Sequence, residues 1–147
     1  MQKDRKIVCP HCSSVNRLVA DKPASEARCG RCGQAMFDAH PAEADAAAFE
    51  KHKDRNEIPV LVDVWAPWCG PCRMMAPAFA EAAGVLEPDV RLIKLNSENE
   101  PEVASRLGIR GIPTMLLYRG GREIARVSGA MSARQIVDWT RAQLGAA

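Results

Sequence analysis

The sequence predicts an α/β protein in which a three-layer domain with a mixed central sheet follows a small cysteine-rich module. From about residue 42 onward, apolar runs of strand length alternate with stretches of helical period, and a Gly-Gly pair joins two of the strands. Four of the six cysteines fall within residues 1–36, where apolar residues are few. The 147 residues are enough for one domain of about 100–150 residues and a small appendage. We therefore expect one module over 1–36 and one domain over 37–147.

The elements of the larger domain follow in order from these patterns. Residues 37–41 form a junction or a first edge strand. After them we expect a helix over 42–53, a strand over 58–66, a helix from 69 to about 86, a strand over 90–96, a helix over 99–107, a hairpin of strands 114–118 and 123–127, and a helix over 132–144. This order is typical of helices packed on both faces of a mixed sheet.

Short local signals support several of these boundaries. Pro77 lies inside the second predicted helix and should kink it. Asn99 and Glu102 have the spacing of a capping box, as do Ser132 and Gln135, so each pair marks the start of a helix.

The N-terminal cysteines form two CxxC pairs, Cys9/Cys12 and Cys29/Cys32, with sixteen residues between them. This spacing is typical of a zinc site of four thiolates, which two short turns can close as a tetrahedron. Structural disulfides or a second redox pair are the alternatives, but the sequence shows no sign of secretion. His11 could replace a sulfur, although four well-spaced cysteines favour its being an exposed residue of the turn. We expect a zinc ribbon with one structural zinc, which supplies the folding free energy that a small core cannot.

Charge and hydropathy bear on location and partners. The net charge is +2, but residues 1–36 carry seven Lys/Arg against three Asp/Glu, a net of +4, and the remainder thirteen against fifteen, a net of −2. The basic end could contact nucleic acid or an acidic partner, but no aromatic stripe accompanies the charge, so we expect a solvated module that binds no nucleic acid. No stretch has signal-peptide or transmembrane character. We expect a cytoplasmic monomer that makes no membrane contact and whose thiols stay reduced.

The segment Val60-Leu-Val-Asp-Val-Trp-Ala-Pro-Trp-Cys-Gly-Pro-Cys-Arg73 is the most informative part of the chain. It predicts a buried strand followed by a helix whose first turn contains Pro71. A helix N-terminus stabilises an anion, which favours a partly exposed Cys69 thiolate as nucleophile. Cys72, one turn further on, is the candidate buried resolving thiol. A structural staple is the alternative, but a bridge between residues three apart closes too short a loop to stabilise much.

Asp63 interrupts the apolar strand six residues before Cys69. Burying a carboxylate is costly unless it has a partner or a function, and desolvation should raise its pKa. The alternative is an Asp at a strand bulge that local hydrogen bonds satisfy. We favour a catalytic role. On sequence alone, Lys94 is an ordinary strand lysine.

Residues 58–147 resemble the thioredoxin family. The matching segments come in the order that the family has them: Trp65-Ala-Pro-Trp-Cys-Gly-Pro-Cys72, Ala76-Pro77, Lys94-Leu-Asn96, Gly108-Ile-Arg-Gly-Ile-Pro-Thr114 and the Gly120-Gly121 hairpin. With the ribbon in front, the whole chain is similar to the zinc-containing thioredoxins of bacteria. One departure is Ser97, which stands where the family usually has an apolar residue, while Glu98 keeps the acid that follows.

The resemblance implies the thioredoxin fold and a set of residue roles. Asp63 would lie beneath Cys72 and accept its proton through water, with Lys94 as its neighbour. Pro113 would be cis and face the active site, and the backbone of Ile112 would pair with an extended substrate as an added strand. The apolar docking surface would consist of Trp68, Gly70, Pro71, Gly111, Ile112, Gly129 and Ala130, whereas Trp65 would pack in the core beneath the site.

The function that the resemblance implies is reduction of protein disulfides. A thioredoxin reductase drawing on NADPH would reduce the Cys69–Cys72 bridge again, so the chain itself would bind no organic cofactor and would act in electron transport and cell redox homeostasis. Two alternatives remain: a zinc-regulated redox sensor or holdase chaperone, and a zinc-ribbon nucleic-acid adaptor that carries a redox domain.

Overall fold

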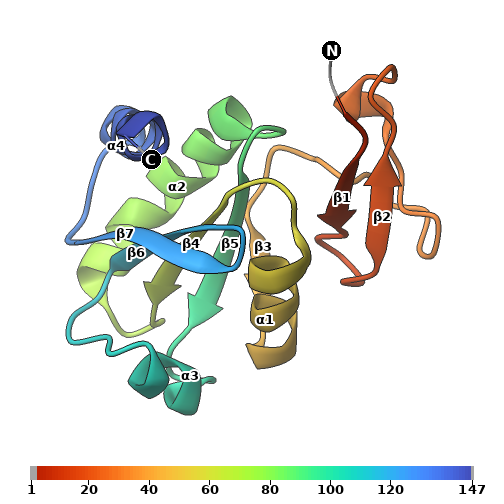
Figure 1. Ribbon diagram of the computed structural model, residues 1–147. Coiled ribbons are helices and arrows are strands. Elements are labelled where there is room, and N and C mark those ends of the chain that lie inside the picture. Colours follow the sequence, from red (N-terminus) through yellow and green to blue (C-terminus); the bar gives the residue numbers. More distant parts are fainter. Residues whose placement is uncertain (1–2, 147) are drawn as a thin grey trace.

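The computed structural model describes residues 3–146 of the chain (Figure 1). Its helices and strands are β1 (Arg5–Val8), β2 (Val15–Leu18), the short 3-10 helix η1 (Ala24–Glu26), β3 (Ala42–Ala44), α1 (Ala46–Arg55), β4 (Val60–Trp65), α2 (Gly70–Leu86), β5 (Arg91–Asn96), α3 (Pro101–Arg106), β6 (Thr114–Arg119), β7 (Arg122–Ser128) and α4 (Ala133–Ala146). Within residues 3–146, no helix is both long and apolar enough to cross a bilayer.

The central sheet has five strands in the order β3-β5-β4-β6-β7. β3, β5 and β4 run parallel, β6 runs antiparallel to β4, and β7 runs antiparallel to β6. The predicted mixed sheet is therefore confirmed. Because β6 runs antiparallel to β4, the C-terminal end of β4 and the N-terminal end of β6 lie side by side at the same end of the sheet.

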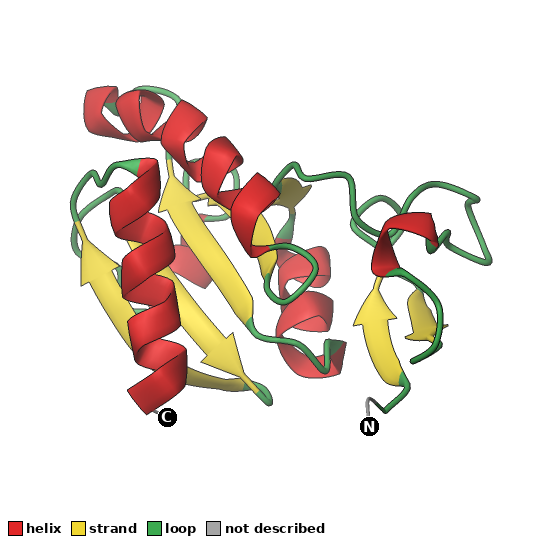
Figure 2. Cartoon of the chain, turned by 90° about the horizontal axis from the view of Figure 1, so that it is seen from above, coloured by secondary structure: helices red, strands yellow, loops and turns green. Residues whose placement is uncertain are grey.

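Helices cover both faces of this sheet (Figures 1 and 2). On one face, Met75 and Phe79 of α2 and Ile136 of α4 pack against strand residues that include Leu61 and Met115. On the other face, α1 and α3 cover a second apolar cluster that consists of Ala42, Ala44, Phe49, Val60, Val62, Val64, Ile93, Leu95, Val103, Leu116 and Tyr118. The central strands are buried on both faces, as their nearly continuous apolar sequence predicts.

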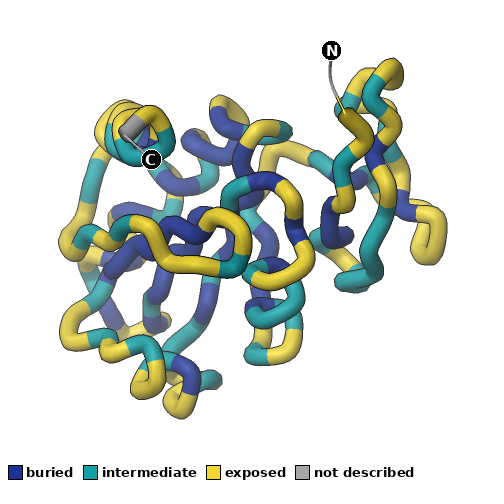
Figure 3. Tube along the Cα trace, viewed as in Figure 1, coloured by how far each residue is buried: buried dark blue, intermediate teal, exposed yellow. Residues whose placement is uncertain are grey.

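The N-terminal module is an antiparallel pair, β1 and β2, with two tight turns that carry the cysteine pairs. Its small core contains Ile7, Leu18 and Met36, and Ile58 from the following domain joins it. Most of its other described residues are exposed or half-buried, whereas the inner strands of the central sheet are buried (Figure 3). A core of this size is the reason to expect another source of folding free energy for the module.

Polar contacts join the module to the larger domain. The backbone N–H of Val8 donates to Asn56 Oδ1 at 2.7 Å. The backbone N–H of Lys6 donates to the Glu57 carboxylate, and the backbone N–H of Glu57 donates to the Lys6 carbonyl oxygen. Arg91, which is fully buried, donates from Nη2 to the carbonyl oxygen of Val8 at 3.2 Å. These contacts fix the module against one edge of the larger domain.

The start of the larger domain differs from its prediction. A helix was expected over 42–53, but Ala42–Ala44 form the edge strand β3 and the helix starts only at Ala46. The alanine-rich composition suggested a helix, but pairing with β5 determines the conformation of the first three residues. Asp45 then accepts a hydrogen bond from the Ala48 N–H at 2.8 Å and caps α1.

The predicted capping boxes have different outcomes. Ser132 and Gln135 form theirs, because each side chain accepts a hydrogen bond from the other's backbone N–H. The predicted Asn99–Glu102 box is wrong: α3 starts at Pro101 and Glu100 is at its N-cap without a side-chain capping bond. A proline at the first helical position has a φ already suited to a helix and lacks an N–H that would be unpaired there, so it favours a helix start at Pro101.

The predicted hairpin turn is confirmed. Gly120 and Gly121 join β6 to β7 with φ of 61° and 81°, a left-handed conformation that glycine adopts without strain.

Candidate active site and metal centre

Cys69 and Cys72, the predicted catalytic cysteines, lie where β4 leads into α2. Cys69 is the N-cap residue of α2, and its Sγ accepts a hydrogen bond from the backbone N–H of Cys72 at 3.2 Å. Pro71 occupies the first turn of the helix, where its missing N–H costs nothing. α2 continues through Pro77 to Leu86. The Cys69 sulfur therefore receives a backbone N–H and the positive end of the helix dipole, which favour its thiolate.

In the structure, Cys69 and Cys72 are joined by a disulfide, with their Cα atoms 5.2 Å apart. Cys72 is 2% exposed, as expected for the resolving thiol. Cys69 is 5% exposed, so the expected partial exposure is wrong for this oxidised state. Ala66, Trp65 and Ile112 pack around the two cysteines and account for this burial.

An apolar groove opens beside Cys69. Its volume is about 580 Å³, and it is lined by Trp68, Cys69, Gly70, Pro71, Ser97, Ala104, Ile109, Arg110, Gly111 and Ile112. Trp68 is 66% exposed, an unusual position for so large an apolar side chain. The Cys69 Sγ lies 3.8 Å from the carbonyl oxygen of Ile112. An extended peptide in this groove would therefore have a sulfur and a backbone segment within reach.

The Ile112–Pro113 peptide bond is cis, as expected from the resemblance. Pro113 is buried, and its carbonyl oxygen accepts a hydrogen bond from the N–H of Gly129 at 2.9 Å. Gly129 has a φ of 105° and is exposed, as is Ala130. Among the described residues, the groove lining includes five of the expected docking residues, while Pro113, Gly129 and Ala130 lie outside it.

Asp63 is the most perturbed carboxyl group of the central sheet. It is fully buried, and neither carboxyl oxygen has a hydrogen-bond partner among residues 3–146. Burial raises the pKa of Asp63 to about 7; the Lys94 charge lowers it and the Glu43 charge raises it. The alternative of a locally hydrogen-bonded bulge is therefore wrong. A carboxyl that titrates near neutral pH is suited to proton transfer.

Lys94 is directly beside Asp63, since the two residues are register partners in the parallel strands β5 and β4. Its Nζ lies 4.3 Å from the ring centroid of Trp65, a cation–π contact. Trp65 packs against the cysteines as predicted, but it is half-buried and not part of the buried core. The geometry thus connects Lys94 to the cysteines through the Trp65 ring.

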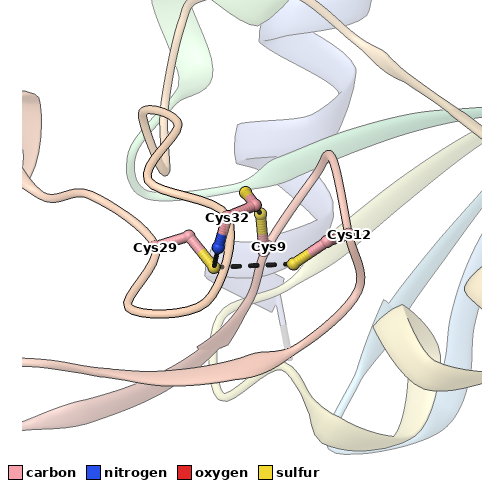
Figure 4. A group of neighbouring side chains, drawn as sticks. All are labelled: Cys9, Cys12, Cys29 and Cys32. Atoms are coloured by element: carbon pink, nitrogen blue, oxygen red, sulfur yellow. Dashed lines mark hydrogen bonds between the residues drawn. The ribbon is translucent and has the colours of Figure 1, made fainter.

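The four N-terminal cysteines converge, although they come from two separate turns (Figure 4). All four Sγ atoms lie within 4.8 Å of one another. The Cys9 and Cys32 sulfurs are 3.7 Å apart, and those of Cys12 and Cys29 are 3.5 Å apart. A tetrahedron with Zn–S bonds of about 2.3 Å requires S···S separations of about 3.8 Å. The cluster therefore fits a four-thiolate zinc site.

The surroundings favour the thiolate form at Cys12 and Cys29, whereas burial raises the pKa of Cys9 to about 12. Backbone N–H groups of His11 and Arg31 point at Cys9 and Cys29 at 3.3 and 3.4 Å. Hydrogen bonding, first of all from Ser14, lowers the pKa of Cys29 to about 5. His11 lies outside the cluster, and its Nε2 is 3.5 Å from the Asp38 carboxylate.

Comparison with known proteins identifies the family. The thioredoxin family model matches residues 40–142, and a second model, described as "Thioredoxin 2, N-terminal", matches residues 8–34. The chain belongs to the thioredoxin family. Its thioredoxin domain follows a zinc-ribbon module. Its activity is that of a protein-disulfide reductase, which is a kind of thiol–disulfide oxidoreductase.

Individual relatives agree with this placement. Thioredoxin C-3 of Corynebacterium nephridii is 38% identical over 138 residues, which cover 94% of each chain. Thioredoxin of Synechocystis sp. is 47% identical over 95 residues, 65% of this chain and 88% of that protein. Among solved structures, a single-residue mutant of thioredoxin from Halobacterium salinarum NRC-1 has a TM-score of 0.65 at 26% identity, covering 73% of this chain and 93% of that one.

Sequence reasoning missed several residues around the site of this thioredoxin-family protein. Ala104, Ile109 and Arg110 line the groove because α3 and the segment after it fold beside the cysteines, a long-range contact that no local pattern shows. Glu43 was assigned to a helix, which concealed its position beside Lys94. The Ala-Glu-Ala alternation of β3 is the one sequence signal that could have placed it.

Proposed function

We propose that this chain is a cytoplasmic thioredoxin that reduces protein disulfides with the Cys69–Cys72 dithiol. The observation that carries the proposal is the position of the Cys69 sulfur at the N-terminus of α2, on the wall of an apolar groove and 3.8 Å from the Ile112 carbonyl oxygen. A substrate disulfide in the groove would meet an activated sulfur there.

In the first step, the Cys69 thiolate attacks one sulfur of the substrate disulfide. The substrate S–S bond breaks, one substrate sulfur leaves as a thiolate, and a mixed disulfide forms between Cys69 and the substrate. The N–H of Cys72 and the helix dipole stabilise the attacking thiolate before this step.

In the second step, Cys72 transfers its proton to Asp63 and attacks the Cys69 sulfur. The bond between Cys69 and the substrate breaks, and the second substrate sulfur leaves as a thiolate that solvent protonates. Two electrons have then passed to the substrate, and the chain has the disulfide that the structure shows. Lys94 is proposed to stabilise the Asp63 carboxylate from the neighbouring strand.

Substrate docking is proposed to use the exposed Trp68 together with Gly70, Pro71, Gly111, Ile112, Pro113 and Gly129. The groove accounts for the first five, and the hydrogen bond from the Gly129 N–H to the Pro113 carbonyl oxygen holds the remaining two next to it. Main-chain pairing at Ile112 would orient the peptide, and the apolar walls would exclude water.

The oxidised form requires a reductant. We propose that a thioredoxin reductase drawing on NADPH supplies two electrons and returns Cys69 and Cys72 to thiols. The same groove would dock the reductase, since it surrounds the bridge that must be attacked. The chain itself would hold no organic cofactor.

We assign one structural zinc ion to Cys9, Cys12, Cys29 and Cys32. The S···S separations suit tetrahedral coordination, and zinc would join the two turns of a module that has little apolar core. We further propose that residues 1–36 and 37–147 form the two domains and that the chain acts as a monomer.

The proposal is tested by insulin reduction with the wild type and the Cys69→Ser and Cys72→Ser variants. The wild type should be active and both variants inactive. Cys72→Ser should accumulate a mixed disulfide with a substrate protein, while Cys69→Ser should trap none. A mixed disulfide on Cys72 instead would reverse the assigned roles.

The alternative, a zinc-regulated redox sensor, is favoured by one observation: Cys32 is exposed and Cys12 is half-buried. Limiting alkylation of the reduced, zinc-loaded chain separates the two functions. The reductase predicts that Cys69 is labelled first and that zinc protects the ribbon thiols. Labelling of Cys32 before Cys69 with zinc still bound would favour the sensor.

A further inference from the structure

Three charged side chains form a row across the sheet. Glu43 of β3 is the register partner of Lys94 of β5, and Lys94 is the register partner of Asp63 of β4. In each strand, the residues directly before and after the charged one belong to the apolar cluster that α1 covers; in β3 these are Ala42 and Ala44. All three charged residues therefore share the opposite face, where α2 packs against the central strands and leaves the edge strand β3 uncovered.

Lys94 lies between Glu43 and Asp63 in the order of the strands, and it forms no ion pair with either among the residues that the structure describes. Its ammonium group lies over the Trp65 ring instead, at 4.3 Å from the centroid. Neighbouring strands are about 4.8 Å apart, so the backbones of Glu43 and Asp63 are roughly 10 Å apart, with the strand that carries Lys94 between them. The positive charge of Lys94 therefore acts on both Glu43 and Asp63.

We propose that Glu43 is a positioning residue for the Asp63 carboxyl group: by drawing on the Lys94 charge from the edge strand, it keeps Asp63 able to hold a proton at neutral pH. The role of this proton rests on the proposed function, in which Asp63 receives it from Cys72. Without Glu43, the Lys94 ammonium would act on Asp63 alone and favour its carboxylate.

The charged surroundings of Asp63 leave few other candidates. β5 contributes Lys94, β3 contributes Glu43, and the facing residue of β6 is the apolar Met115. From α2, Cys72 is the buried titratable residue, and it is ionisable only when reduced. Burial accounts for most of the raised pKa of Asp63, while Glu43 raises it further and Lys94 opposes both.

Glu43 is suited to this role because it stays in contact with solvent. It is exposed on the edge strand and lines two cavities, of about 440 and 370 Å³, between the N-terminal module and the central domain. Its charge can therefore be removed without opening a void in the core. The effect of a Gln substitution should be electrostatic rather than structural.

The test is a pH titration of the Asp63 carboxyl carbon by NMR in the full-length, oxidised chain. In the wild type, Asp63 should titrate near pH 7. In Glu43→Gln, the midpoint should fall by roughly half a pH unit, the size expected for one charge about 10 Å away that solvent partly screens. An unchanged midpoint in Glu43→Gln would overturn the proposal.

Two matched variants make the result specific. Glu43→Asp keeps the charge and should keep the wild-type midpoint. Glu102→Gln removes one charge from an exposed position on α3, which covers the opposite face, and should also leave the midpoint in place. An equal fall in Glu102→Gln would mean that net charge alone is responsible and would overturn the role of Glu43.

A second measurement separates this inference from the proposed function. The rate at which Cys72 resolves a mixed disulfide should have a pH midpoint that falls in Glu43→Gln together with that of Asp63. If the Asp63 midpoint falls while the pH profile of resolution stays fixed, Glu43 does control Asp63, but Asp63 is not the proton acceptor. The titration alone therefore decides the inference.

Discussion

The guanidinium group of Arg91 donates a 2.7 Å hydrogen bond to the carbonyl oxygen of Met36, and so joins the first residue of β5 to the end of the cysteine-rich module. Arg91 is fully buried, and its Nη1 lies 3.1 Å from the carboxylate of Glu87, whose side chain is 2% exposed. The same guanidinium stacks on the Phe37 ring, 4.5 Å from its centroid. One buried cation therefore connects the end of α2, β5 and the module.

Replacing Arg91 by Met should strongly destabilise the protein. The substitution keeps most of the apolar volume but leaves the Glu87 carboxylate and two carbonyl oxygens buried without a donor. Breaking one side of a buried ion pair typically costs about 3–5 kcal/mol. Urea unfolding of the zinc-loaded chain measures this loss.

The matched control is Arg134→Met, which removes an exposed ion pair with Asp138 at 3.7 Å. Exposed pairs contribute about 0–1 kcal/mol, so this variant should unfold almost as the wild type does. Equal unfolding midpoints for the two variants would show that the Arg91 network contributes little.

Asp63→Asn should stabilise the protein at pH 8 but not at pH 4. The pKa of Asp63 is raised from its usual value of 3.8 to about 7, so between these values the folded state holds a proton that the unfolded state has released. Stability contributed by this proton is lost as pH rises through this range, about 4 kcal/mol in total at about 1.4 kcal/mol per pH unit. Asn does not titrate and avoids the loss.

Urea unfolding of the oxidised chain at both pH values tests this. The difference in unfolding free energy between Asp63→Asn and the wild type should be large at pH 8 and small at pH 4. A difference that is the same at both pH values would mean that the Asp63 carboxyl does not titrate with a raised pKa.

Local patterns in the sequence predicted the parts of the structure that depend on local chemistry. The Ser132–Gln135 box needs only two side chains three residues apart, and the Gly120-Gly121 turn needs only two residues that tolerate positive φ. Asp63 was predicted as a buried carboxyl with a raised pKa because nothing polar accompanies it in its strand. Such features follow from neighbours in sequence.

The parts that sequence could not supply depend on contacts between distant segments. Ala42–Ala44 have helical composition, but pairing with β5, some fifty residues later, makes them a strand. Arg91 looks like an ordinary polar residue at a strand end, yet carbonyl oxygens 55 and 83 residues away make it the buried link to the module. Glu43 gains its relation to Asp63 only through the order of strands β3, β5 and β4.

Zinc binding should require all four cysteines. Cys29→Ser removes the sulfur that lies 3.5 Å from Cys12 Sγ. The number of thiolate ligands then falls from four to three, which should weaken zinc binding. Metal analysis of protein purified under reducing conditions should give one zinc per chain for the wild type and far less for Cys29→Ser. His11→Ala is the control, because His11 lies outside the cluster and should leave the zinc content unchanged. Loss of zinc in His11→Ala would make it a ligand.

Removal of residues 1–36 should leave a folded reductase of lower stability. Residues 37–147 retain the five-stranded sheet and every proposed catalytic residue. They lose the cover over Ile58, which is 4% exposed and packs in the core of the module. They also lose the carbonyl acceptors of Arg91. We expect a loss of roughly 1–3 kcal/mol, the size of one uncovered apolar side chain and a few hydrogen bonds.

The coupling between the two parts can be measured with Ile58→Ala. In the full-length chain, this substitution empties a buried site and should cost about 2–5 kcal/mol. In the 37–147 fragment, Ile58 is already uncovered, so the same substitution should cost much less, and the difference is the interaction energy across the interface.

Insulin reduction by the fragment should stay within a few-fold of the full-length rate, because the groove beside Cys69 contains no residue of the module. Equal costs of Ile58→Ala in both backgrounds would show that the module does not stabilise the domain through this core, and an inactive but folded fragment would show that the module takes part in the reaction.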